Sequence, residues 1–159
     1  MKNIFLNKLK KEKKLELVEP SEEICQSYLE KSDNSLKSAK LLLANNLYEN
    51  SVGMSYYAMY NSLTALLVKT GIKCENHSGS ILILKLIFDK KDLFSIISDA
   101  KKERIDKQYY ITEEKDEITK EVAEQLLQHA EDFALNLKVI IKEISNDYIN
   151  GVREIIKNI

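Results

Sequence analysis

The sequence has few of the residues that build turns, disulfides and metal sites. Its 159 residues include four glycines and one proline, which argues against an all-β fold and against disorder. The two cysteines, Cys25 and Cys74, have neither metal-site spacing nor a disulfide framework, so we expect reduced thiols in a cytoplasmic protein. The two histidines, His77 and His129, have no nearby cysteines or paired carboxylates, so we expect no metal and no cofactor.

A charge imbalance and long apolar runs are also missing. The net charge is −1, so a nucleic-acid site would have to be a local basic patch. No apolar segment approaches the length of a transmembrane helix, and the run at residues 4–6 is too short for a signal peptide. We therefore expect a soluble protein of the size of one domain.

The stretch from Glu49 to Gly71 is the most apolar part of the chain. Only Lys69 carries a charge between its ends, and apolar residues recur at helical spacing from Val52 to Leu67. A helix that is apolar over most of its circumference is normally covered by neighbours. This stretch is therefore predicted to be the central buried helix, with Gly71 at its C-terminal cap.

Helical periodicity covers most of the remaining chain. It predicts helices over residues 21–44, from His77 to about residue 88, over 93–104, through a long seam ending near Ser145, and over 148–157. Residues 105–118 are predicted to form an exposed loop, and strand signals are absent. The fold class is therefore all-α, an up-and-down bundle of four to five helices over residues 21–159.

Residues 1–20 are predicted to be a basic, amphipathic N-terminal arm. Six lysines alternate with apolar residues, a pattern that an anionic membrane or a nucleic acid can bind. The alternative is that the arm lays its apolar side chains on the bundle or on a second subunit. Glu12, Glu16 and Glu19 dilute the positive charge, which favours the second interpretation over a membrane.

Two segments resemble a known family. The succession of SAKLLLANNLYENSV, then SYYAMYNSLTALLVKTGI, then His77-Ser78-Gly79 is similar to the small prokaryotic HEPN-domain proteins over about residues 28–144. The resemblance implies a helical bundle that pairs as a homodimer. Members are often encoded beside a minimal nucleotidyltransferase as toxin–antitoxin partners, and many are ribonucleases.

The resemblance also points to a candidate site. The family's ribonucleases share an arginine and a histidine a few residues later, in a cleft between two subunits. Arg104 matches the arginine, but the expected histidine positions hold Tyr109 and Tyr110 followed by isoleucine. Only two of the 24 basic residues are arginine, so Arg104 is a candidate for its planar fork as well as its charge. The alternative role of Arg104 is structural, in an ion pair with a neighbouring carboxylate such as Asp106. We count Asp106 itself among the ligand-binding candidates.

Three further residues are candidates for ligand binding. His77 stands at a helix start, where it could cap that helix or reach a ligand from the loop. Tyr56 and Tyr57 are adjacent on the central helix, so one should point inward and the other sideways; such a pair is usually core with its hydroxyls bonded.

Two functions follow from this pattern. RNA cleavage without a metal needs a base near neutral pH, and histidine is the residue that suits this task. Since the motif histidine is replaced, the chain is predicted to be a non-catalytic or weakly active partner of a minimal nucleotidyltransferase that binds RNA or nucleotide in a dimer cleft. The alternative is a metal-independent endoribonuclease toxin, with Arg104, Tyr109 and Tyr110 at its catalytic site.

Overall fold

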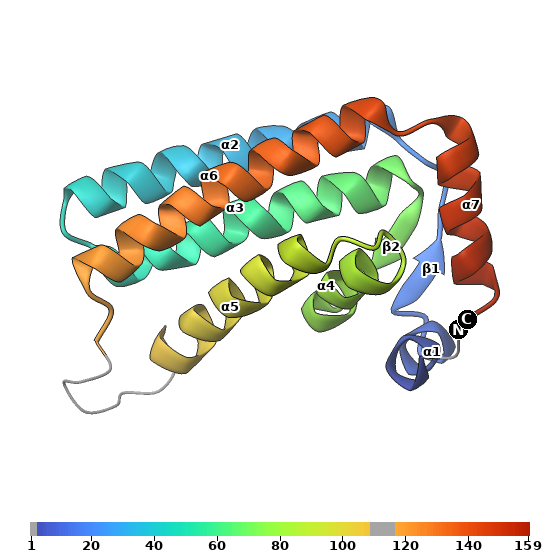
Figure 1. The fold of residues 1–159 in the computed structure, drawn as a ribbon, viewed down its shortest axis with the longest axis horizontal. Coiled ribbons are helices and arrows are strands. Elements are labelled where there is room, and N and C mark those ends of the chain that lie inside the picture. Colours follow the sequence, from blue (N-terminus) through green and yellow to red (C-terminus); the bar gives the residue numbers. More distant parts are fainter. Residues whose placement is uncertain (1–2, 109–116) are drawn as a thin grey trace.

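The computed structural model describes residues 3–108 and 117–159. Along the chain it has α1 (Ile4–Lys11), β1 (Leu15–Leu17), α2 (Glu22–Ala44), α3 (Tyr48–Lys69), β2 (Ile72–Cys74), α4 (His77–Leu86), α5 (Lys91–Gln108), α6 (Lys120–Glu143) and α7 (Asn146–Lys157) (Figure 1). The predicted all-α class is confirmed, with seven helices in the described part of the chain. The helices predicted from periodicity are all present, and their ends lie within a few residues of the predicted ones. The predicted loop over residues 105–118 is wrong at its start, because α5 continues to Gln108, and its residues 109–116 lie outside the described part of the chain.

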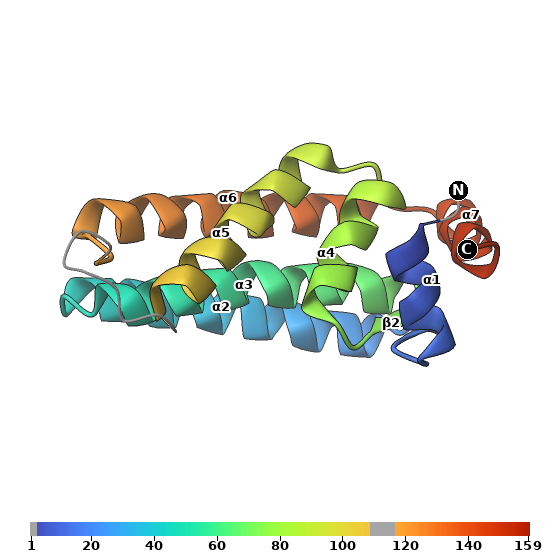
Figure 2. The ribbon, with the colours of Figure 1, turned by 90° about the horizontal axis from the view of Figure 1, so that it is seen from below.

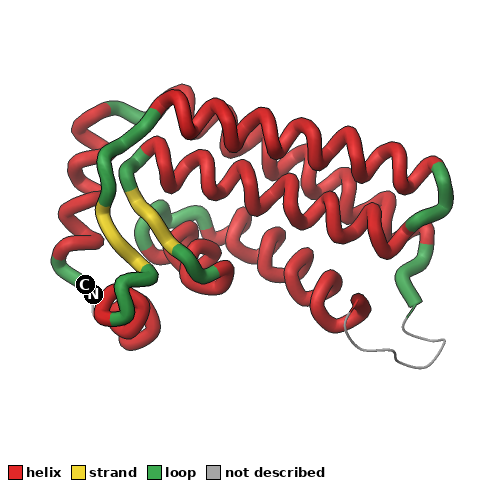
Figure 3. Tube along the Cα trace, turned by 180° about the vertical axis from the view of Figure 1, so that it is seen from behind, coloured by secondary structure: helices red, strands yellow, loops and turns green. Residues whose placement is uncertain are grey.

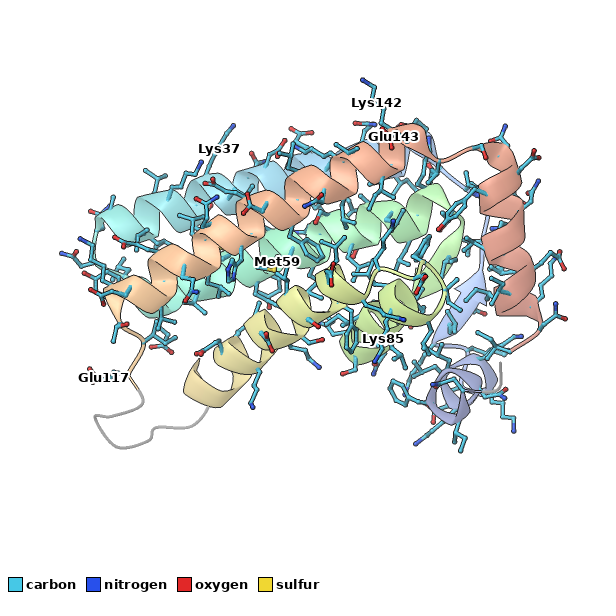
Figure 4. The ribbon with its side chains drawn as sticks, in the orientation of Figure 1. Lys37, Met59, Lys85, Glu117, Lys142 and Glu143 are labelled. Carbon is cyan, nitrogen blue, oxygen red and sulfur yellow. The ribbon has the colours of Figure 1, made fainter. Side chains whose placement is uncertain are left out.

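The long helices α2, α3 and α6 run side by side, and α5 crosses them on one face (Figures 1 and 2). The predicted central helix is α3, which contacts α2, α5 and α6. Tyr56, Met59 and Leu63 on α3 are fully buried, and Met59 lies in the interior of the molecule in Figure 4. The bundle is therefore organised around α3, as its composition predicts.

Small polar residues allow α2 and α3 to approach closely. The hydroxyl of Ser32 donates to the backbone carbonyl of Ala58 at 2.7 Å, and that of Ser51 donates to the carbonyl of Ala39 at 2.8 Å. All four residues are fully buried. Each hydroxyl is thus satisfied by the facing helix backbone, so its burial costs little free energy.

Side-chain caps explain where the helices begin. Ser21, Asn76, Thr119 and Ser145 each accept a hydrogen bond from the backbone N–H three residues later, at the starts of α2, α4, α6 and α7. Asn76, rather than His77, therefore caps α4. The possible capping role of His77 is wrong, because the asparagine one residue earlier already holds that position.

The N-terminal arm contains a helix and a strand. Leu6, Leu9 and Leu15 are buried, so these three side chains of the arm face the core of the same chain, whereas Ile4 and Phe5 are exposed. The prediction of no strands is wrong at one place: β1 and β2 form an antiparallel pair in which Leu15 faces Cys74 and Leu17 faces Ile72 (Figure 3). Each strand has only three residues, too few for an alternating pattern to stand out from the sequence.

Arg153 joins α7 to the chain around β1 and to the C-terminal end of α3 by hydrogen bonds. On α7, the Nη1 atom of Arg153 donates to the backbone carbonyls of Val18 at 2.7 Å, Gly71 at 2.9 Å and Thr70 at 3.2 Å. Gly71 follows α3 with a φ of +68°, the left-handed conformation predicted for its cap. Within the described ranges, no helix is long and apolar enough to cross a membrane.

Candidate functional site

The predicted site residues His77, Tyr56, Tyr57 and Arg104 come together where α3, α4 and α5 meet. Tyr56 and Tyr57 lie near the middle of α3, His77 is the first residue of α4, and Arg104 lies on α5. Tyr56 is fully buried, whereas Tyr57, His77 and Arg104 are half-buried. The adjacent tyrosines therefore divide as predicted, one inward and one towards the surface.

Arg104 lies against the two tyrosine rings. The central carbon of its guanidinium is 4.9 Å from the ring centre of Tyr57 and 5.1 Å from that of Tyr56. At this distance the negative faces of the rings attract the cation. The rings hold the guanidinium in a defined place, and a guanidinium in general presents a planar fork of N–H groups that suits carboxylates and phosphates.

Two tyrosines of α3 contact the ring of His77. Its ring stacks on that of Tyr60, with centres 3.8 Å apart and planes 15° apart, and its Nδ1 is 2.8 Å from the hydroxyl oxygen of Tyr56. Burial raises the pKa of Tyr56, so its hydroxyl keeps its proton at neutral pH. A buried hydroxyl needs an acceptor, so we assign this proton to the bond with Nδ1. The neutral imidazole then carries its own proton on Nε2.

Burial and two neighbouring cations both favour the neutral form of the imidazole. Burial lowers the pKa of His77 below its ordinary value, and the positive charges of Arg104 and Lys101 lower it further. Lys101 lies one helical turn before Arg104, and its ammonium donates to the hydroxyl of Ser78 at 2.6 Å. Lysine, arginine and a neutral imidazole donor therefore surround one small region.

An open hollow lies beside Arg104, with a volume of about 580 Å³. We call it the Arg104 hollow; its lining residues are Ser38, Leu41, Leu42, Asn50, Gly53, Met54, Tyr57 and Arg104. Leu41 is 67% exposed although its side chain is apolar. The hollow joins a cation and an aromatic ring to an apolar rim, which suits a ligand with both a phosphate and a planar base.

Tyr60 and Lys101 belong to this site but are not among the residues predicted for it. Tyr60 follows Tyr56 by one helical turn, a spacing that places both rings on one side of α3. That spacing is the available signal, although the same pattern is typical of a packed core. Tyr109, Tyr110 and the side chain of Asp106 lie outside the described residues.

His129 lies in a different place. It lines a hollow of about 530 Å³ between α5 and α6, which also includes Asp99 and Glu103. In the described part of the chain, no group of three or more histidine, cysteine, aspartate or glutamate side chains is placed to hold a metal ion.

The chain matches the model of the HEPN domain over residues 25–151. It is 32% identical to "Putative toxin MJ0605" of Methanocaldococcus jannaschii over 126 residues, which are 75% of this chain and 90% of the relative. It is 30% identical to "Putative toxin MJ0142" of the same organism over 131 residues, 79% of this chain and 86% of the relative. A "UPF0332 protein" of Archaeoglobus fulgidus is 27% identical over 115 residues, 69% of this chain and 89% of the relative. The matched segment runs from α2 into α7 and includes every described residue of the site, so the chain belongs to the HEPN domain family.

Proposed function

We propose that this chain is a toxin-associated HEPN protein that binds RNA or a nucleotide through a phosphate at Arg104. The observation that carries the proposal is the placement of Arg104 on the rings of Tyr57 and Tyr56, at the edge of an open hollow. A guanidinium in a fixed orientation can meet two phosphate oxygens at once. Two relatives bear the name of toxins, which supports a toxin-associated role.

The groups around Arg104 suit the rest of a nucleotide. Tyr57 is half-buried, so an exposed part of its ring is available for a base to stack on. The Nε2–H of His77 is a neutral donor that suits a phosphate or a ribose hydroxyl. Lys101 adds a second cation one turn away on α5. Together these groups supply the charge and the stacking surface of a single-stranded RNA site.

The same geometry favours binding over cleavage. A histidine that acts as a general base must offer a ring nitrogen without a proton, and Nδ1 of His77 is occupied by the hydroxyl of Tyr56. The site therefore offers phosphate recognition, while its imidazole is not free to act as a base.

A metal-independent endoribonuclease is the second candidate, and one observation favours it. His77 lies close enough to Arg104 for the arginine's charge to lower its pKa, so an imidazole accompanies the arginine despite its absence from positions 109–111. If the Tyr56–His77 bond opened when substrate bound, the ring could take up the proton of a 2′-hydroxyl.

One titration separates the two candidates. A fluorescein-labelled single-stranded RNA is titrated with the protein in EDTA, its anisotropy is recorded, and its length is then checked on a denaturing gel. Saturable binding with intact RNA supports the proposal, while cleavage in EDTA supports the second candidate. An unchanged anisotropy together with intact RNA contradicts both.

We also propose that two copies of the chain pair across the Arg104 hollow, and that a minimal nucleotidyltransferase is the partner of this dimer. The exposed Leu41 beside Arg104 supports pairing, since an apolar rim loses unfavourable contact with water when a second copy covers it. Failure of a nucleotidyltransferase encoded beside this chain to co-purify with it would contradict the partner.

Leu41→Glu is expected to weaken dimerisation at least tenfold, because a carboxylate in an apolar interface must lose its water. Leu135→Glu is the matched control: Leu135 is 63% exposed on α6, outside the Arg104 hollow. Sedimentation velocity of the two variants and the original chain measures the effect. A dimer that survives Leu41→Glu, or an original chain that sediments as a monomer, contradicts pairing across this hollow.

A further inference from the structure

A second hollow of about 430 Å³ opens between α1, α4 and α5, and we call it the Phe94 hollow. Its floor is apolar and aromatic, with Phe5 from α1, Ile81 and Leu82 from α4, and Phe94 from α5. Phe5 is 38% exposed and Phe94 is half-buried, so parts of both rings reach the surface. Aromatic rings at a surface hollow are platforms on which planar ligands stack.

The rim of the Phe94 hollow is basic. Lys101 and Lys102 line it, and the ammonium of Lys85 is 4.7 Å from the ring centre of Phe94. Among the described residues that line this hollow, lysine is the only charged type. Three lysines thus lie around two partly exposed rings in a chain whose net charge is −1. This combination is typical of surfaces that bind single-stranded nucleic acid.

The Phe94 hollow adjoins the site at Arg104 through Ser78 and Lys101. Ser78, which lines the hollow, directly follows His77 and accepts a hydrogen bond from Lys101. Lys101 and Arg104 lie three residues apart on α5, so their Cβ atoms are about 5–6 Å apart on one side of the helix. A strand whose phosphate is bound by Arg104 therefore meets Lys101 next, and then the two phenylalanine rings.

We propose that the Phe94 hollow is a subsite that binds the base of a neighbouring nucleotide when single-stranded RNA is bound at Arg104. The inference rests on the proposed function and extends it: the ligand is a strand of several nucleotides rather than a single nucleotide. Stacking on phenylalanine and point charges from lysine do not distinguish the bases, so binding at this subsite is tolerant of sequence. The arm contributes Phe5, which gives α1 a part in RNA binding.

The test uses a fluorescein-labelled octauridylate and the full chain in EDTA, followed by fluorescence anisotropy. The double variant Phe5→Leu, Phe94→Leu keeps apolar side chains in place but removes both rings, and we expect it to bind at least tenfold more weakly. Tyr148→Leu is the control, since it removes an aromatic ring of similar exposure, 38%, on α7. It should bind as the original chain does.

A second variant separates a loss of RNA binding from a loss of folding. Lys102 is exposed at the rim, so Lys102→Glu is expected to leave the melting temperature unchanged and to weaken octauridylate binding severalfold. If Arg104→Ala weakens binding while the phenylalanine and Lys102 variants bind normally, the subsite is overturned and the proposed function stands. If the original chain does not bind octauridylate, the proposed function itself fails. Binding of a labelled peptide of alternating glutamate and leucine that depends on Phe5 and Phe94, with unchanged RNA affinity, would assign the hollow to a protein partner and overturn the subsite.

Discussion

Gly71→Ala is expected to lower the free energy of unfolding by about 4 kcal/mol, the largest effect we foresee for a single methyl group in this chain. Gly71 has a φ of +68°, and a side chain there adds about 1–2 kcal/mol of strain. A Cβ atom at this position would lie 2.0 Å from Nη1 of Arg153 and 2.4 Å from the carbonyl oxygen of Val18. The second neighbour is backbone, so relief requires the chain at Val18, directly after β1, to move away from Gly71.

That movement would break bonds that fasten the end of the bundle. The N–H of Val18 donates to the carbonyl of Gly71 at 2.9 Å, and Arg153 donates to the carbonyls of Val18 and Gly71. Loss of charge-assisted bonds of this kind costs about 1.5–3 kcal/mol in addition to the strain. Urea denaturation followed by circular dichroism measures the loss, and we expect the melting temperature to fall by about 10 °C.

Gly151→Ala is the matched control for this prediction. Gly151 lies in α7 and is exposed, and a Cβ atom there meets nothing within 4 Å. Alanine is a better helix former than glycine, so this variant should be more stable by about 0.5–1 kcal/mol. The same chemical change is thus expected to have opposite signs at two positions. Equal effects at both positions would rule out the close approach at Gly71.

The helices of this chain are predictable because their signals are local. The caps at Ser21, Thr119 and Ser145 and the left-handed Gly71 act within a few residues of the helix ends they define. The composition of α3 alone indicates that it is central. Of these signals, the left-handed Gly71 and the central position of α3 are predicted from the sequence, and the structure agrees with both.

The β1–β2 pair and the hydrogen bonds of Arg153 depend on contacts between segments that are distant in the sequence. Leu15 and Cys74 are far apart in the sequence, and nothing within either three-residue strand specifies its partner. Arg153 looks in the sequence like any charged residue of a surface helix, yet its guanidinium reaches carbonyls on two other segments. Such pairings follow from how the helices assemble, so a single sequence does not predict them.

The candidate site is only partly predictable: its residues can be identified from the sequence, but their meeting in space cannot. Tyr56, Tyr57, His77 and Arg104 are predicted as separate candidates, from a resemblance and from residue type. Their meeting depends on the crossing of α3, α4 and α5. The sequence motif also directs attention to positions 109–111 for a histidine, whereas the imidazole near Arg104 comes from α4, about 27 residues earlier in the chain. The family's spacing between arginine and histidine is a local signal. It cannot predict a histidine that another helix brings close to the arginine.

Replacing Arg104 by alanine is expected to weaken binding of octauridylate by tenfold to a hundredfold. A charge-assisted bond from a guanidinium to phosphate contributes about 1.5–3 kcal/mol, and each 1.4 kcal/mol corresponds to a factor of ten. Arg104→Lys keeps the charge but loses the planar fork and the contact with the rings of Tyr56 and Tyr57. It should therefore recover only a small part of the lost affinity.

Salt dependence shows whether Arg104 acts through a phosphate. Each phosphate contact with a single strand contributes about 0.7 to the slope of log affinity against log salt concentration, so Arg104→Ala should reduce this slope by about that amount. Lys37→Ala is the control, because Lys37 is exposed and points away from the bundle on α2 (Figure 4). It removes the same formal charge and should leave both the affinity and the slope nearly unchanged. If the two variants lose affinity equally, RNA is attracted by net charge alone, and the placement of Arg104 on its tyrosines has no part in recognition.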